Sequence, residues 1–162
     1  MKNIFPERKE IRLNEYDYST PGSYFVTVCA SERRNIFWNE ESVGASIARP
    51  RDIVLSSYGK SLDDAVNKIS NIYPMVRIDH YVIMPDHFHI LLTIRANVDG
   101  RAMLAPTVGK IVQQLKGYVT KQIGFSIWQK SFFDHIIRNS QDYDEHVKYI
   151  YENPMRWNYK NN

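Results

Sequence analysis

The chain has 162 residues, 43% of them hydrophobic and 24% charged, and a formal net charge of +3. This length suits one globular domain that buries a core without staples, so residues 1–162 are predicted to form a single domain. The sequence shows no apolar run near the roughly 20 residues that span a bilayer, no secretory signal and a single cysteine, which together exclude a membrane protein or a disulfide scaffold and favour the cytoplasm.

Residues 1–20 are polar and charged, and they are predicted to be an N-terminal arm outside the core. The β-branched and aromatic residues at 23–29 then predict a first strand. Residues 39–52 lack a clear period and are predicted to be a loop with at most a short helix. A longer helix, capped by a serine at 56 or 57, follows the 3.6-residue period until Pro74 ends it.

Residues 76–84 and 87–95 are predicted to be two strands of a hairpin, because turn residues separate two apolar runs. A loop at 97–106 leads to a helix that begins after Thr107, has one apolar face and closes at Gly124.

A short strand at 132–138 precedes the final predicted helix, which Asn139 or Ser140 caps. We expect this helix to end at Asn153, because a following proline disfavours helical backbone at that residue. The order strand, helix, strand, strand, helix, strand predicts an α+β, ferredoxin-like antiparallel sheet with helices on one face. The final helix is appended to this unit.

The most informative motif is His87-Phe88-His89, at the start of the third predicted strand. Side chains two apart on a strand share a face, so both imidazoles leave the same side with their backbones roughly 7 Å apart. One metal ion could join them, whereas Phe88 would turn toward the core with Ile90, Leu92 and Ile94. Two surface histidines are the alternative, and a third ligand would have to come from elsewhere.

The final predicted helix carries Tyr149 and Asn153, which are one turn apart. At about 100° per residue, Tyr149 falls outside the apolar stripe and on the same flank as Asp142, His146 and Asn153, while Tyr151 is expected to pack in the core. A phenol oxygen can attack a phosphodiester that a metal polarises. A half-exposed surface tyrosine is the alternative for this helix taken alone.

Four stretches, in this order along the chain, resemble the REP-associated tyrosine transposases, which belong to the single-tyrosine HUH transposases: GSYFVTV (22–28), PDHFHIL (85–91), FDHIIRN (133–139) and YIYENP (149–154). The resemblance covers about residues 16–157. It implies that His87, His89 and Asn153 hold Mg²⁺ or Mn²⁺ and that Tyr149 forms a 5′-phosphotyrosine link. It also implies a partner, single-stranded or hairpin DNA, and a protein that works as a monomer or homodimer.

Basic side chains that could contact phosphates are spread along the chain, and any one of them could equally be a solvated charge. The candidates are Arg33, Arg34, Lys110, Lys116 and Arg138. Of the remaining histidines, His135 is predicted to contact DNA, to support the site or to be structural, and His80 to pack in the core.

Two other functions stay open. A non-catalytic module of the same fold would bind single-stranded nucleic acid through aromatic residues on the sheet, without metal. The histidine pair stands where such aromatic residues would be expected. A metal-dependent phosphodiesterase that activates water would leave Tyr149 idle, and it would keep cutting after Tyr149→Phe.

Overall fold

The structure, a computed structural model, describes residues 18, 20–44, 53–96 and 105–161, with side chains up to residue 157. Most of the predicted N-terminal arm and most of the predicted 97–106 loop lie outside the described residues. The strands are β1 (Gly22–Cys29), β2 (Val76–Ile83), β3 (His87–Ile94) and β4 (Phe133–Ile136). The helices are the 3₁₀ turn η1 (Ser31–Arg33), α1 (Glu40–Gly44), α2 (Ser57–Ile72), α3 (Val108–Ile123) and α4 (Ser140–Asn161).

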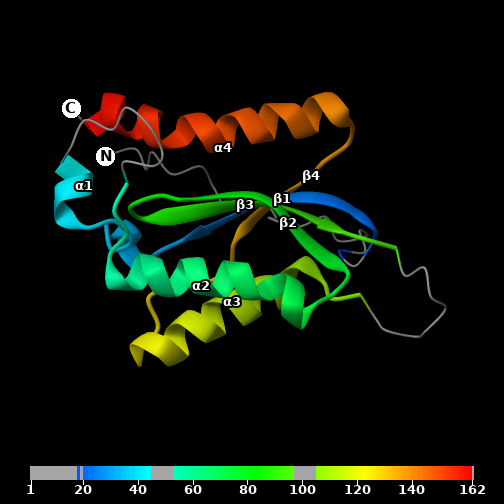
Figure 1. Ribbon diagram of the computed structural model, residues 1–162, viewed down its shortest axis with the longest axis horizontal. Coiled ribbons are helices and arrows are strands. Elements are labelled where there is room, and N and C mark those ends of the chain that lie inside the picture. Colours follow the sequence, from blue (N-terminus) through cyan, green and yellow to red (C-terminus); the bar gives the residue numbers. More distant parts are fainter. Residues whose placement is uncertain (1–17, 19, 45–52, 97–104, 162) are drawn as a thin grey trace, which may run out of the picture.

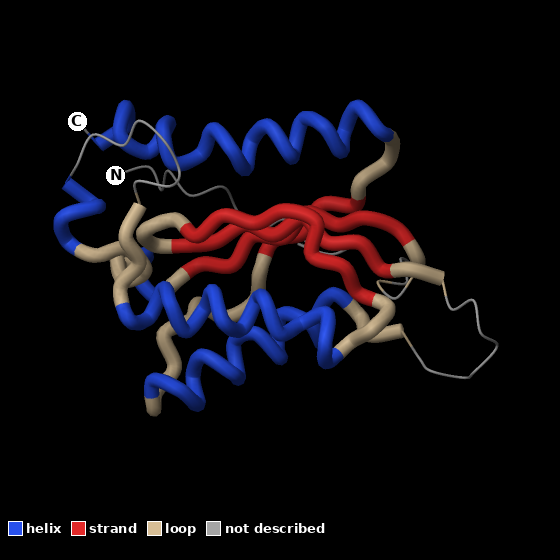
Figure 2. The backbone as a smooth tube through the Cα atoms, in the orientation of Figure 1, coloured by secondary structure: helices blue, strands red, loops and turns tan. Residues whose placement is uncertain are grey.

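The strands form one antiparallel sheet in the order β2-β3-β1-β4. Helices α2 and α3 cover one face of this sheet and α4 covers the other, so the described part of the chain has three layers (Figures 1 and 2). The predicted α+β, ferredoxin-like sheet with an appended helix is therefore confirmed. Among the described helices, none has the length and apolar character that crossing a bilayer requires.

The main core lies between the sheet and the α2–α3 layer. Strand alternation sends every second residue of β3 to this side, where Phe88, Ile90, Leu92 and Ile94 are buried as predicted. Leu62 and Ile69 of α2 and the apolar stripe of α3 close the core from the other side. Burying each such side chain stabilises the fold by roughly 1.5–3 kcal/mol. The alternate residues of each strand point to the opposite face of the sheet, which α4 covers.

Both helices of the core layer begin at side-chain caps that the sequence predicts. Ser56 accepts a hydrogen bond from the backbone N–H of Gly59, and Thr107 accepts one from Lys110. Each bond pairs a backbone donor that the first turn leaves without an intrahelical acceptor. Gly124 ends α3 in the left-handed conformation, with a φ of 95°, which glycine adopts without steric cost.

Two helical glycines, Gly59 and Gly117, differ in what a side chain would meet. A Cβ atom on Gly59 would lie 2.1 Å from the carbonyl oxygen of Phe37, whereas one on Gly117 would meet nothing within 4 Å. We expect Gly59→Ala to lower the free energy of unfolding by about 1–3 kcal/mol, because the backbone of residue 37 has to move. Gly117→Ala should raise it by about 0.5–1 kcal/mol. Urea unfolding of both variants measures these two changes. If both variants changed the free energy of unfolding in the same direction, this account would be contradicted.

The predicted end of the last helix at Asn153 is wrong, since α4 continues through Pro154 to Asn161. Proline removes one backbone donor and crowds the preceding turn. Here Pro154 is itself buried and Trp157 packs against the core cluster. Tertiary packing thus holds the helix across a residue that local preference would use to end it.

Two further predictions are wrong, and a register shift in β2 accounts for the first of them, the placement of His80 in the core. The irregularity lies between Ile78 and His80, so that Ile78 pairs with Leu92 while His80 pairs with Leu91. This turns His80 away from the core toward α4, where its Nδ1 lies 3.3 Å from the hydroxyl of Tyr151. Tyr151, predicted to be a core residue, is 55% exposed. Local alternation could not reveal this shift, because a bulge inserts an extra residue that changes the facing of those around it.

Candidate functional site

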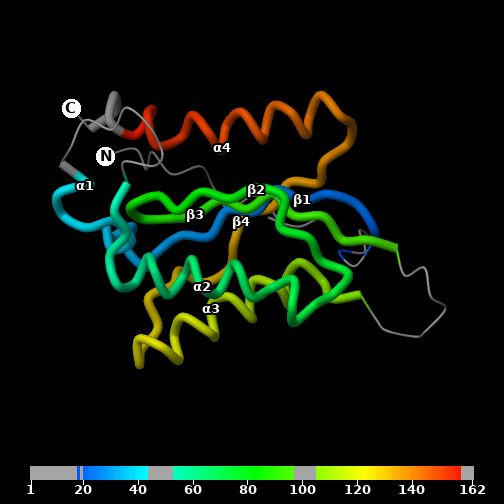
Figure 3. The backbone as a smooth tube through the Cα atoms, in the orientation of Figure 1, coloured from blue at the N-terminus to red at the C-terminus, as the bar shows by residue number. Residues whose placement is uncertain are grey.

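A pocket of about 550 Å³ lies between α4 and the sheet. Its walls come from β1, η1, β3, β4 and α4, and the lining residues are Thr27, Arg33, His87, His89, Phe133, Tyr149, Asn153, Arg156 and Trp157. Segments that are distant in the sequence meet here because the chain passes from the α3 layer along β4 to the α4 layer on the other side of the sheet (Figure 3). The structure therefore brings His87, His89, Tyr149 and Asn153 into one pocket.

The two histidines of the pocket face each other. Their Nε2 atoms are 3.1 Å apart. On the far side of each ring, Nδ1 is already bonded: His87 Nδ1 lies 2.5 Å from Asp86 Oδ1, and His89 Nδ1 lies 2.7 Å from Thr27 Oγ1. The central strand β1 sets this arrangement, because Thr27 pairs directly with His89. With Nδ1 held, each ring can present the lone pair of Nε2 to one shared ion.

Burial and neighbouring charge keep His89 neutral. Burial, followed by the charges of His87, Arg33 and His146, lowers the pKa of His89 to about 2. The ring therefore carries no charge at physiological pH, which is the state in which imidazole binds a metal. Phe25 stacks on this ring, with centroids 5.1 Å apart and planes inclined by 21°, so the ring is held in place as well.

Asp86 joins the histidine pair to a basic side chain. Its Oδ2 accepts a hydrogen bond from Arg33 Nε at 2.8 Å, while its Oδ1 faces His87. Burial alone would raise the pKa of the Asp86 carboxyl. The hydrogen bond and charge of His87, together with Arg33, outweigh burial and hold that pKa below its ordinary value. Asp86 is therefore a carboxylate that accepts the Nδ1–H of His87 and fixes its tautomer.

The α4 helix brings Tyr149 and Asn153 to the same pocket. The ring of Tyr149 lies 5.3 Å from that of His89, and the residue is 38% exposed. Asn153 is 8% exposed, and its Nδ2 has no hydrogen-bond partner among the described residues. A buried amide without such a partner can turn its oxygen toward a hard cation. The donor set of His87, His89 and Asn153 therefore fits a divalent metal.

The pocket contains two residues of α4 that the sequence prediction missed, Arg156 and Trp157. Arg156 Cζ lies 6.0 Å from the ring centroid of Tyr149, and the rings of Trp157 and His87 are 6.4 Å apart. They were missed because the helix was expected to end at Asn153. The spacing of residues 149, 153 and 156 is the signal that could have found them, since it follows one helical face.

Of the three predicted phosphate-contacting residues near the ends of β1 and β4, one lines the pocket and two do not. Arg33 lines the pocket, and Arg34 is exposed with its Nε 3.6 Å from Glu32 Oε2. Arg138 is exposed just before α4, and its backbone N–H donates to Asp142. Arg33 therefore lies beside the histidine pair, whereas Arg34 and Arg138 are not among the residues that line the pocket.

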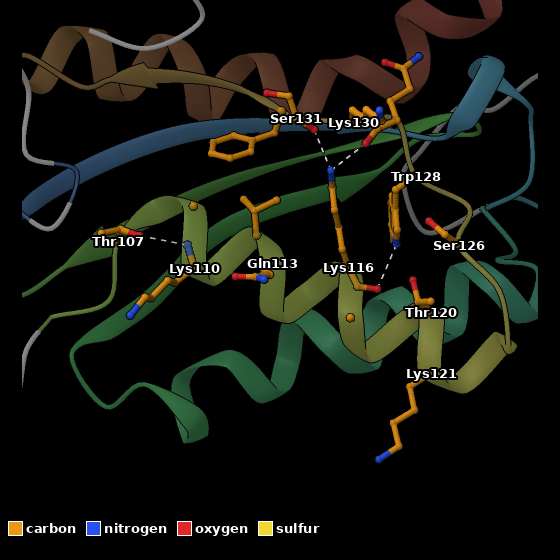
Figure 4. Close-up of a pocket in the computed structure, with 15 residues that line it drawn as sticks. Thr107, Lys110, Gln113, Lys116, Thr120, Lys121, Ser126, Trp128, Lys130 and Ser131 are labelled. Atoms are coloured by element: carbon orange, nitrogen blue, oxygen red, sulfur yellow. Dashed lines mark hydrogen bonds between the residues drawn. The ribbon is translucent and has the colours of Figure 1, made fainter. Parts of the chain in front are cut away.

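Lys110 and Lys116 lie on α3, on the other side of the sheet. They line a separate pocket of about 810 Å³ between α3 and residues 126–132 (Figure 4). Lys116 Nζ donates to the carbonyl oxygens of Gln129 at 2.9 Å and Ser131 at 2.8 Å. Lys116 thereby ties α3 to the segment before β4. Contacts from these two lysines would need DNA to reach the face opposite Tyr149, and their DNA-binding role stays a prediction.

Comparisons with known proteins give relatives that match most of the chain. The chain is 31% identical to the REP-associated tyrosine transposase of Escherichia coli K12, in a match covering 89% of this chain and 74% of that protein. An uncharacterized Haemophilus influenzae protein is 30% identical over 93% of this chain and 89% of its own length. The solved structure of a REP-associated tyrosine transposase bound to a REP hairpin superimposes with a TM-score of 0.61, at 26% identity over 89% of this chain and 74% of that one. No protein-family model matches.

With the fold and the pocket described above, these relatives place the chain among enzymes of the DNA transposase kind. More narrowly, the chain belongs to the REP-associated tyrosine transposases. The resemblance inferred from the four sequence stretches is therefore confirmed.

Proposed function

We propose that this chain cuts and rejoins single-stranded DNA beside a hairpin through a covalent link between Tyr149 and the 5′ phosphate. His87, His89 and Asn153 would hold the Mg²⁺ or Mn²⁺ that the reaction needs. The observation that carries the proposal is that one pocket holds a partly exposed tyrosine, two facing Nε2 atoms and the amide of Asn153, whose Nδ2 has no partner in the described part of the chain. The solved relative is bound to a REP hairpin, which supports hairpin DNA as the substrate class.

The chemistry follows from the placement of these side chains. The hydroxyl oxygen of Tyr149 attacks the phosphorus of a phosphodiester in the pocket, the bond from phosphorus to the 3′ oxygen breaks, and that oxygen gains a proton in place of the one that the phenol loses. A bound divalent ion would supply positive charge to the phosphate oxygens. The phosphoester bond is exchanged rather than hydrolysed, so the free 3′-hydroxyl can attack the tyrosine link and reseal the strand.

The cationic and aromatic walls of the pocket suit a nucleotide. Arg33 and Arg156 line it, each paired with a carboxylate, of Asp86 and Glu152 respectively, and Trp157 offers a flat apolar surface. Guanidinium groups bind phosphate oxygens with two parallel hydrogen bonds, and aromatic rings stack on unpaired bases. Tyr149 of α4 packs beside His89 of the same chain, with ring centroids 5.3 Å apart, which supports a site that acts in cis.

The test uses one hairpin-bearing single strand, labelled at its 5′ end in one sample and at its 3′ end in another. With Mn²⁺, we expect the 3′-labelled fragment to migrate with the protein on a denaturing gel and the 5′-labelled fragment to run free. EDTA should prevent both products. This pattern follows because the tyrosine keeps the strand that begins with the cleaved phosphate.

Each alternative function predicts a different gel. Free fragments from both labels, with metal but without an adduct, would favour the phosphodiesterase that activates water. Binding of the hairpin without cutting, unaffected by EDTA, would favour the non-catalytic module. An adduct that carries the 5′ label would reverse the proposed polarity.

Asp86 gives a prediction for the metal site, because its carboxylate orients His87 and offsets the charge of Arg33. We expect Asp86→Asn to weaken Mn²⁺ binding by about 10–100-fold, which is the range for losing a partner of a histidine ligand. Free Mn²⁺ is measured by its electron paramagnetic resonance signal. Asp79→Asn is the matched control, since Asp79 is also a carboxylate with a buried side chain, paired with Arg77, but it lies outside the pocket. Equal losses in both variants would contradict the assigned role.

A further inference from the structure

A second group of possible metal ligands lies where β4 meets α4, outside the pocket described above. His135 comes from β4, and Asp142 and His146 come from the first turns of α4. We propose that these three residues bind a divalent transition-metal ion of the Zn²⁺ or Co²⁺ class. This site is distinct from the Mg²⁺ or Mn²⁺ site of the proposed reaction and goes beyond that reaction.

The geometry is that of ligands gathered around one point. His135 Nε2 lies 2.8 Å from Asp142 Oδ2 and 3.0 Å from its Oδ1, and His146 Nδ1 lies 3.1 Å from the same Oδ1. One ligand atom from each residue can be chosen so that all three lie within 4.8 Å of one another. Among the described residues, no other trio of histidine, cysteine or acidic side chains meets this distance.

The two imidazole rings are already arranged side by side. Their centroids are 4.7 Å apart and their planes are inclined by 18°. His135 directs its Nε2 at the Asp142 carboxylate, whose Oδ2 also accepts the backbone N–H of Arg138 at 3.0 Å. His146 directs its Nδ1 at the same residue, 2.8 Å from the backbone carbonyl oxygen and 3.1 Å from Oδ1. A metal ion would take the place of the ring protons that now point at Asp142. The hydrogen bond from Arg138 would continue to orient that carboxylate.

The ligand types select the class of ion. Two imidazoles and one carboxylate form the set found at zinc sites that keep an open position for water, and at related sites of other transition metals. Mg²⁺ prefers oxygen ligands, so it suits this cluster poorly. The side chain of His135 is 40% exposed and that of His146 is 22% exposed. The cluster is therefore open enough for an ion to enter and for water to complete its coordination.

Because of the position of the cluster, a bound ion would affect α4, the helix that carries Tyr149. The ring of Phe25 lies 4.6 Å from that of His146, 5.1 Å from that of His89 and 5.9 Å from that of Tyr149. An ion at the cluster would join β4 to α4 one turn before Tyr149 and hold His146 against Phe25. The bound state would thus fix the start of the tyrosine helix over the sheet.

The test is a Co²⁺ titration of the full chain carrying His87→Ala and His89→Ala, which removes the other histidine pair. We expect one Co²⁺ per chain with visible absorption bands, displaced by Zn²⁺, and a Zn²⁺-dependent rise in Tm that EDTA reverses. Adding His135→Phe keeps a ring beside His146 but removes a ligand nitrogen, so affinity should fall by about 100-fold or more. His80→Phe, which changes a half-buried histidine outside the cluster, should leave affinity unchanged.

If the double variant does not fold cooperatively, the same titration is made on the wild-type chain, where His135→Phe should reduce the number of bound Co²⁺ ions by one. Absence of binding in a folded double variant would overturn the proposal. Binding that survives His135→Phe undiminished would overturn it as well.

Discussion

Tyr149→Phe is expected to abolish the covalent protein–DNA adduct and to lower strand cleavage by at least about 10³-fold, because it removes the attacking oxygen. The ring stays, so its contacts with Phe25 and His89 persist. Hairpin binding, measured by fluorescence anisotropy, should change little. The measurement is the initial rate of adduct formation with Mn²⁺ on a denaturing gel.

Tyr151→Phe is the matched control for this change. Tyr151 stands two residues farther along α4, is 55% exposed and bonds to His80 rather than lining the pocket. Its variant should form the adduct at the rate of the unchanged chain. Adduct formation that survives Tyr149→Phe and disappears with Tyr151→Phe would show that Tyr151, and not Tyr149, is the nucleophile.

The second large effect is expected from His89→Ala. This ring is buried, neutral and directed at His87, so its loss leaves the proposed metal with one imidazole. Metal ions contribute several kcal/mol to stabilising charge at a reacting phosphate, and each 1.4 kcal/mol is a factor of ten in rate. We therefore expect cleavage to fall by about 10³-fold and Mn²⁺ binding to be lost in the same variant.

His80→Ala separates loss of a ligand from a general effect of removing a histidine on this sheet face. His80 faces α4 as His89 does, but it lies outside the pocket. Its variant should keep both Mn²⁺ binding and cleavage. Cleavage that survives His89→Ala at the original rate would exclude this histidine as a ligand and would undermine the metal site as a whole.

The features that the sequence predicted correctly depend on short-range periodicity. Alternation along 87–94 is enough to put Phe88 in the core and both histidines on the other face, and this is what the structure shows. The caps Ser56 and Thr107 are equally local, since a side-chain oxygen meets a backbone donor three residues away. In the same way, helical spacing alone put Tyr149 and Asn153 on one flank of α4.

The features that the sequence did not reveal depend on packing between distant segments. Local preference ends the last helix before Pro154. The helix nevertheless continues, because Pro154 is buried and Trp157 packs against the core. Strand alternation places His80 inside, but the shift after Ile78 turns it toward α4. The bond between Asp86 and Arg33 joins residues 53 positions apart, so the sequence does not reveal it either. Such contacts leave no local period in the sequence.

The sheet divides its two faces between different tasks. The side under α2 and α3 is filled by apolar residues such as Phe88 and Leu92, while His87, His89 and Tyr149 meet on the side under α4. Mutations of His87, His89 or Tyr149 thus leave the apolar core under α2 and α3 unchanged. In evolutionary terms, we therefore expect inactivation and unfolding to be separable for this chain, so that a sequence that loses Tyr149 can still fold and remain exposed to selection.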